Sequence, residues 1–192
     1  MKRVLLATIL GAVTLFAWQF VSRMQLRYYQ DTISPWPGEA AAVEAVLKGF
    51  PESGAYQYPA MPSDSAGRDK LVEYAKNKPV ANLLIVNKAG SEIHSPKMYA
   101  ISFGLHVISC LLASLILLAA RVGALNIGRR FLIIFLLGVF AAVTVQAPYW
   151  VWLGFPQKFT LVVMGEVGVG WFLAAIVMAI VFQRPKEQSV EV

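Results

Sequence analysis

Four polar side chains interrupt apolar runs in which ionisable groups are rare. Glu166 is the one acidic residue inside these runs, and His106, Gln146 and Gln19 occur in the three others. A carboxylate and an imidazole can exchange protons, and an amide can orient either group by hydrogen bonding. A site that titrates or binds a ligand is one interpretation. The other is a hydrogen bond between Glu166 and Gln146 that only joins helices.

The four side chains are expected at similar depth if the apolar runs are helices that cross a bilayer. At ~1.5 Å per residue, Glu166 lies about six residues from the outer end of its run, Gln146 about seven and His106 about eight. Gln19 is the shallowest. A carboxylate at the centre of a spanning helix costs about 2.5–3.5 kcal/mol on insertion scales. We therefore expect Glu166 to face the interior of a bundle, with His106 or Gln146 as its partner.

Other site chemistry finds little support in the residues. His106 and Glu166 supply two candidate ligands, whereas a zinc site takes three or four protein ligands. The single cysteine, Cys110, can build neither a disulfide framework nor a cysteine zinc site. The chain has no C-x-x-C-H motif for haem attachment, and no G-x-S-x-G, Walker A or H-E-x-x-H motif. The sequence therefore predicts no metal and no cofactor, and it favours a protein that is not an enzyme.

Four long apolar runs are expected to form the helices that carry these residues. The chain is 57% hydrophobic and 15% charged, with a mean hydropathy of +0.59, which is far from an ordinary soluble domain. The runs cover residues 4–21, 98–120, 131–153 and 160–182, and each approaches the ~20 residues that span a bilayer. The first is interpreted as an uncleaved anchor, because it is longer than a signal-peptide core and lacks a small-x-small cleavage site.

Basic residues in the short loops predict the orientation. They precede the first run, separate the second from the third and follow the fourth, which places both termini in the cytoplasm. These residues are Lys2, Arg3, Arg121, Arg129, Arg130, Arg184 and Lys186. The net charge of +6 is explained by this topology, and no Lys/Arg cluster indicates a nucleic-acid partner. The predicted location is a bacterial inner (cytoplasmic) membrane.

The predicted fold is an all-α four-helix transmembrane bundle with a small α+β extracytoplasmic domain between spans 1 and 2. The expected segments are transmembrane helix 1 (1–21), the periplasmic or extracellular domain (22–97), transmembrane helix 2 (98–120), a cytoplasmic loop (121–130), transmembrane helix 3 (131–153), a short outer loop (154–159), transmembrane helix 4 (160–182) and a cytoplasmic tail (183–192). The domain is small, so we expect it to rest on the helices or on a partner.

Breaker residues divide the extracytoplasmic domain into short elements. The sequence predicts helices over 39–47 and 65–77, a strand over 80–86, a turn at 87–90 and a return strand over 91–94. The stretch 56–62 contains Pro59 and Pro62 and is expected to be extended or looped.

Aromatic residues gather at the predicted outer boundary. Trp18, Tyr149, Trp150 and Trp152 have the positions of an interfacial belt that anchors helices in the bilayer. Stacking on a ligand such as a quinone is the alternative interpretation.

Glycines surround Glu166 in the fourth run. Gly165, Gly168 and Gly170 predict a small-residue face that allows another helix to approach closely. Their spacing is not a dinucleotide fingerprint, because it lies within an apolar span rather than after a soluble strand.

Three short stretches resemble a loose group of small uncharacterised bacterial four-span inner-membrane proteins. The stretches are Phe-Ala-Trp-Gln-Phe at 16–20, Gly-Ala-Tyr-Gln-Tyr-Pro at 54–59 and Ala-Pro-Tyr at 147–149. The resemblance implies the four-span architecture over most of the chain and carries no established activity. Tetraspan proteins share this topology, but their paired outer cysteines are missing here. The four-helix quinone-dependent disulfide reductases require a C-x-x-C motif that is also absent.

The leading functional interpretation is a non-enzymatic accessory or scaffold subunit of a membrane complex. Its expected partners are membrane lipids and either another protein or a second copy of the chain. One alternative is a proton-coupled carrier or channel-like protein that uses Glu166. Another is a protein that binds a lipid or quinone at the outer leaflet.

Overall fold

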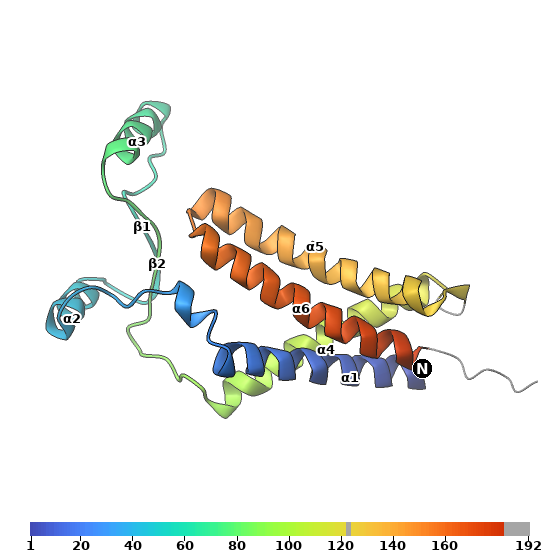
Figure 1. The fold of residues 1–192 in the computed structure, drawn as a ribbon. Helices are drawn as coiled ribbons and strands as arrows, with labels where there is room; N and C mark the ends of the chain where they lie inside the picture. Colours follow the sequence, from blue (N-terminus) through green and yellow to red (C-terminus); the bar gives the residue numbers. More distant parts are fainter. Residues whose placement is uncertain (122–123, 183–192) are drawn as a thin grey trace, which may run out of the picture. The chain divides into compact units, whose positions relative to one another are not determined.

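The computed structural model describes residues 1–121 and 124–182 and is mostly helical (Figure 1). The predicted cytoplasmic tail, 183–192, lies outside the described residues, as do two residues of the predicted loop 121–130. The chain divides into two compact units. The helical unit comprises Met1–Ser34, His94–Trp150 and the residues from Phe155 onward. The sheet unit comprises Pro35–Ile93 and Val151–Gly154.

Four long helices make up the helical unit. They are α1 (Lys2–Phe20), α4 (Pro96–Ala119), α5 (Ile127–Leu153) and α6 (Gln157–Val181). Each is long and apolar enough to cross a membrane, which confirms the four predicted helices in length and composition. The first continues past residue 21 through the π-helical turn η1 (Val21–Gln25), so its apolar stretch runs from Lys2 to Gln25.

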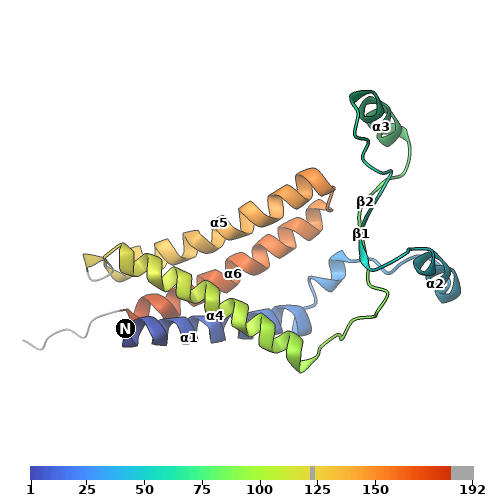
Figure 2. The same ribbon diagram turned by 180° about the vertical axis from the view of Figure 1, so that it is seen from behind.

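Helix α1 packs against both α4 and α6 (Figures 1 and 2). Small residues make these close contacts, since Ala7, Gly11 and Ala12 are all buried. A Cβ on Gly11 would lie 2.7 Å from Sδ of Met178 and 3.0 Å from Sγ of Cys110, so a side chain at this position would crowd both neighbouring helices.

Aromatic side chains join α5 to α6. The ring of Phe172 on α6 meets Phe131 and Phe135 of α5 edge-on, with ring centroids 5.4 and 5.9 Å apart. Edge-to-face pairs at this spacing are favourable. Trp171 of α6 lies directly over Gly138 of α5. A Cβ built on Gly138 would overlap the Cβ and Cγ atoms of Trp171. Gly138 is therefore the position at which α5 accommodates the indole.

The sheet unit contains two short helices and one antiparallel strand pair. Helix α2 (Ala40–Lys48) and helix α3 (Ser65–Asn77) agree with the predicted helices to within one residue. The Asp64 side chain caps α3 by accepting a hydrogen bond from the backbone N–H of Gly67. A hydrogen bond between the Tyr58 and Tyr74 hydroxyls, 3.4 Å apart, raises the pKa of Tyr74 above its ordinary value.

The strand pairing differs from the sequence prediction. Strand β2 (Ala81–Val86) matches the predicted strand, but its partner is β1 (Gly54–Tyr58). The return strand predicted over 91–94 is wrong, because the chain turns there to begin α4. His94 has φ 61°, and the Ser95 side chain accepts a hydrogen bond from the Met98 N–H as the cap of α4. The prolines at 59 and 62 end the strand and do not prevent it.

We expect Gly138→Ala to destabilise the protein by about 1–3 kcal/mol, because the new methyl group overlaps Cβ and Cγ of the Trp171 side chain and forces α5 away from α6. The matched control is Gly104→Ala on α4, where no described atom lies within 4 Å of the new Cβ. Alanine is the better helix former, so this variant should be as stable as the wild type or more so. Unfolding in mixed micelles measures both, and equal effects would refute the packing role of Gly138.

Candidate functional site

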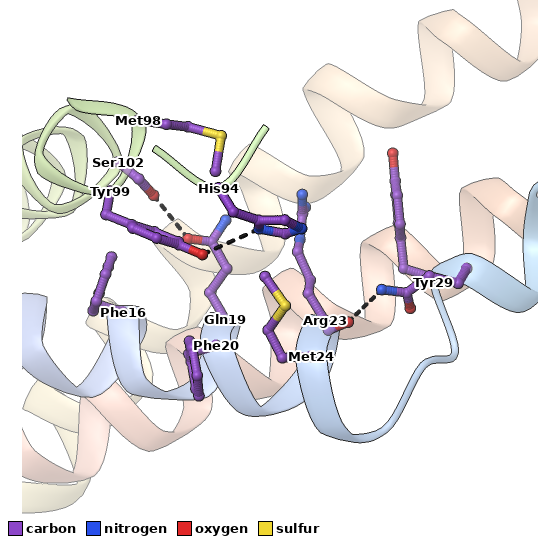
Figure 3. A pocket seen from close by; sticks show the side chains of 11 residues that line it. Phe16, Gln19, Phe20, Arg23, Met24, Tyr29, His94, Met98, Tyr99 and Ser102 are labelled. Carbon is purple, nitrogen blue, oxygen red and sulfur yellow. Dashed lines mark hydrogen bonds between the residues drawn. The ribbon is translucent and has the colours of Figure 1, made fainter. Parts of the chain in front are cut away.

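Polar side chains gather where α1 ends and α4 begins (Figure 3). The side-chain oxygen of Gln19 accepts a hydrogen bond from the Ser102 hydroxyl at 2.9 Å and lies 3.1 Å from Nε2 of His106. An edge-on contact with the Phe16 ring, at 6.4 Å between centroids, also holds the His106 imidazole. Two members of the predicted polar layer, Gln19 and His106, therefore meet across the contact between α1 and α4.

Glu166 has a different partner from the one that the sequence analysis expected. Its carboxylate accepts hydrogen bonds from Nε of Arg23 at 2.9 Å and from Nη2 at 3.3 Å. The Glu166 side chain is 6% exposed, whereas that of Arg23 is 39% exposed. Such a two-pronged contact between guanidinium and carboxylate is short, charge-assisted and directional. The buried charge is thus paired with Arg23 and not with His106 or Gln146.

The π-helical turn η1 explains how Arg23 reaches Glu166. The apolar run ends at Val21, so the sequence analysis assigned Arg23 to the outer domain. The backbone stays helical through Gln25 instead, and Ser22 is buried within it. Single π-helical turns are rare and often occur at functional sites. A useful signal in the sequence was an arginine just past an apolar run, because such long side chains reach back along a helix.

Trp18 belongs to the same contact between α1 and α6. Its indole Nε1 donates a 2.8 Å hydrogen bond to the backbone oxygen of Glu166. A Cβ on Gly170 would lie 2.9 Å from Cδ1 of this indole, so the glycine makes room for it. Trp18 is therefore a packing residue inside the helical unit as well as a candidate for the predicted aromatic belt.

The remaining predicted residues lie outside this cluster. Gln146 is half-buried on α5, and its side chain makes no hydrogen bond to another residue in the described part of the chain. Apart from the neighbouring residues and backbone of α6 itself, no described atom comes within 4 Å of a Cβ built on Gly165 or Gly168. Three of the predicted belt residues, Tyr149, Trp150 and Trp152, are 43%, 46% and 81% exposed.

A cavity of about 320 Å³ lies against this cluster, between α1, α4 and the turn that follows η1 (Figure 3). Its polar lining consists of Gln19, Arg23, Gln30, His94, Tyr99 and Ser102. Its aromatic and thioether lining consists of Phe16, Phe20, Met24, Tyr29 and Met98. None of the described residues that line it is acidic. The cavity thus offers hydrogen-bond donors beside an apolar wall.

Arg23 lies between the cavity just described and a second, smaller cavity. Its guanidinium carbon lies 4.8 Å from the centre of the Tyr29 ring, and its backbone oxygen accepts a hydrogen bond from Gln30 of the 3-10 turn η2 (Gln30–Thr32). Behind it, a smaller cavity of about 100 Å³ is shared by Arg23, His106 and Glu166. The ion pair therefore separates a larger cavity without carboxylates from a smaller one that contains Glu166.

The arrangement is suited to binding more than to covalent chemistry. Among the described residues, no three His, Cys, Asp or Glu side chains lie close enough together to hold a metal ion. The donors at the larger cavity are guanidinium, amide and hydroxyl groups, which fix the orientation of a ligand that carries acceptor atoms.

Comparison of the chain with protein-family models, curated proteins and solved structures finds no match. The resemblance to small bacterial four-span membrane proteins therefore stays a prediction. Any function must be argued from the geometry of the site.

We expect Arg23→Met to destabilise the protein strongly, because it leaves the Glu166 carboxylate buried without a partner. Removal of one member of a buried ion pair costs about 3–5 kcal/mol, and the partial exposure of Arg23 places this case at the lower end. The double variant Arg23→Met/Glu166→Met should recover most of the loss, since apolar pairs replace buried ion pairs well.

The matched control for this prediction is Lys48→Met on α2, which breaks the ion pair between Lys48 and Glu44. Both of those side chains are exposed, at 73% and 67%, so the loss should be about 0.5 kcal/mol or less. Chemical unfolding of the four proteins in mixed micelles measures the differences. Similar losses for Arg23→Met and Lys48→Met would contradict a structural role for the Arg23–Glu166 pair.

Proposed function

We propose that the protein is a multi-pass membrane protein that binds a small amphiphile, of the lipid or quinone class, between α1 and α4. The cavity beside Arg23 is the observation that carries this proposal. Its volume of about 320 Å³ lies at the lower end of the ~300–1,000 Å³ typical of small-molecule sites. A polar side next to an apolar wall is what a ligand with a polar head and an apolar tail requires.

The mouth of the cavity supports an amphiphilic ligand. Phe20 of α1 and Met98 of α4 line the cavity and are 48% and 40% exposed, so the apolar wall continues to the surface of the helical unit. In the proposed topology, with basic loops in the cytoplasm, this end of the helices lies near the outer boundary of the membrane. A ligand head would sit beside Arg23 there, and its tail would leave between α1 and α4 into lipid.

The ion pair weakens the alternative of a proton-coupled carrier. Carriers use intramembrane carboxylates that exchange protons or ions during transport. Glu166 is held by two hydrogen bonds from Arg23, and Trp18 bonds to its backbone oxygen. This geometry favours a charge pair with a structural role, which also holds a donor-bearing guanidinium at the cavity.

The accessory-subunit interpretation is kept as a second candidate because of one surface feature. Gly165 and Gly168 leave part of α6 without side chains, and no described atom fills the space above them. Small residues on a helix surface permit close approach of another helix in a membrane. The open glycines are therefore the position at which a helix of a partner would pack.

Gentle extraction followed by native mass spectrometry tests the ligand site. The wild-type protein should carry a bound amphiphile, identified by fragmentation of the released small molecule. Met24→Trp fills the cavity from η1 and should weaken ligand binding by about tenfold in Kd, equivalent to ~1.4 kcal/mol, which lowers the ligand occupancy in the spectra. Met61→Trp, at a position that is 63% exposed in the sheet unit, is the matched control. Equal occupancy in both variants would refute binding in this cavity.

The accessory role predicts a stoichiometric protein partner in the same native spectra. Gly165→Leu/Gly168→Leu should abolish its association, because the leucines fill the space that a partner helix would occupy. The control, Leu161→Ile, changes an exposed position of the same helix without closing that space. A lone monomer in the wild-type spectra, without any co-purified protein, would count against this candidate.

A further inference from the structure

Building on the proposed ligand site, we infer that the cavity selects amphiphiles with a neutral head group that carries carbonyl acceptors, as quinones do, over amphiphiles with an anionic head. The inference comes from the position of the Arg23–Glu166 ion pair at one edge of the cavity. Glu166, which does not line this cavity, compensates the charge of Arg23 and leaves part of the guanidinium available to a ligand.

The guanidinium has donors to spare. Nε and Nη2 of Arg23 each donate to Glu166, and an arginine has five N–H groups, so about three remain. Gln19 supplies further hydrogen-bond donors through its side-chain amide. The oxygen of that amide already contacts Ser102 and His106. Its amide NH₂ makes no hydrogen bond to another residue in the described ranges. The polar end of the cavity therefore presents unused donors, which carbonyl oxygens can accept.

Charge decides between a carbonyl and an anion. Among the described residues that line the cavity, Arg23 is the only Lys, Arg, Asp or Glu, and its charge is already balanced by a carboxylate 2.9 Å away. An anionic head on the same guanidinium would add a second negative charge beside Glu166, whose side chain is only 6% exposed. Like charges in a poorly solvated site repel each other strongly. A neutral acceptor gains the hydrogen bonds without this repulsion.

The aromatic lining favours a flat head group. The Tyr29 ring lies beside the Arg23 side chain, with its centre 4.8 Å from the guanidinium carbon, and the His94 and Tyr99 rings lie 27° from parallel with their centres 6.3 Å apart (Figure 3). Planar faces of this kind pack well against another ring. A quinone ring combines flatness, neutrality and carbonyl acceptors, and its apolar tail fits the wall formed by Phe20 and Met98.

The test compares two probes with saturated tails of similar length, decylubiquinone and decanoate. Each is titrated into the full-length protein in nanodiscs of zwitterionic lipid, and binding is measured by isothermal titration calorimetry. The wild type should bind decylubiquinone at least about tenfold more tightly than decanoate. Glu166→Gln removes the compensating charge and keeps an amide acceptor for Arg23. The ratio of the affinity for decylubiquinone to the affinity for decanoate should therefore fall by about tenfold or more.

Glu73→Gln is the matched control, because it makes the same charge change at an exposed position of α3 and should leave the ratio unaltered. Tighter binding of decanoate than of decylubiquinone by the wild type would overturn the inference and leave the ligand site standing. An unchanged ratio in folded Glu166→Gln would also overturn it. Binding of neither probe to the wild type would overturn the proposed function itself. The wild-type comparison remains decisive even if Glu166→Gln does not fold.

Discussion

A carboxylate among apolar helices requires a polar partner, and at Glu166 the pairing with Arg23 determines how α1, η1 and α6 meet. Arg23 satisfies it with two hydrogen bonds, and Trp18 adds a third contact to the backbone of the same residue. For Arg23 to be in place, α1 must continue as helix beyond its apolar run, which it does through the π-helical turn. The chain can then leave α1 only after Arg23, so the cavity forms between that turn and the start of α4.

The same requirement explains why α1 packs closely against both α4 and α6. A helix that pairs with α6 through a charge and with α4 through Gln19 must approach both closely, and only small side chains allow this. Ala7, Gly11 and Ala12 provide that close approach. Helix α5 is joined to α6 by aromatic rings and by the fit of Trp171 over Gly138. The contacts of Gln19, Arg23 and Trp18 with α4 and α6 therefore lie beside the cavity.

The proposed function follows from how charge is divided at this site. Glu166 and His106 line the smaller cavity, while the larger one receives the free side of Arg23 together with amide and hydroxyl groups. A balanced guanidinium is a strong hydrogen-bond donor that does not attract anions as an unpaired one would. The ion pair thus stabilises the contact between helices and sets the chemistry of the larger cavity at the same time.

The sequence by itself determined the four apolar helices, the two short helices of the sheet unit and the strand predicted over 80–86 and found at Ala81–Val86, because these depend on local hydrophobicity, capping and breaker residues. It also identified Glu166 and Gln19 as residues of interest, since polar groups in apolar runs need partners. The partners were decided by tertiary structure. Arg23 was not recognised because α1 continues as helix beyond its apolar run, and Gln146 was expected in the cluster because helix rotation cannot be counted from sequence. The pairing of β1 with β2 was likewise a long-range choice, because the segment before α4 had to turn into that helix and was not free to return as a strand.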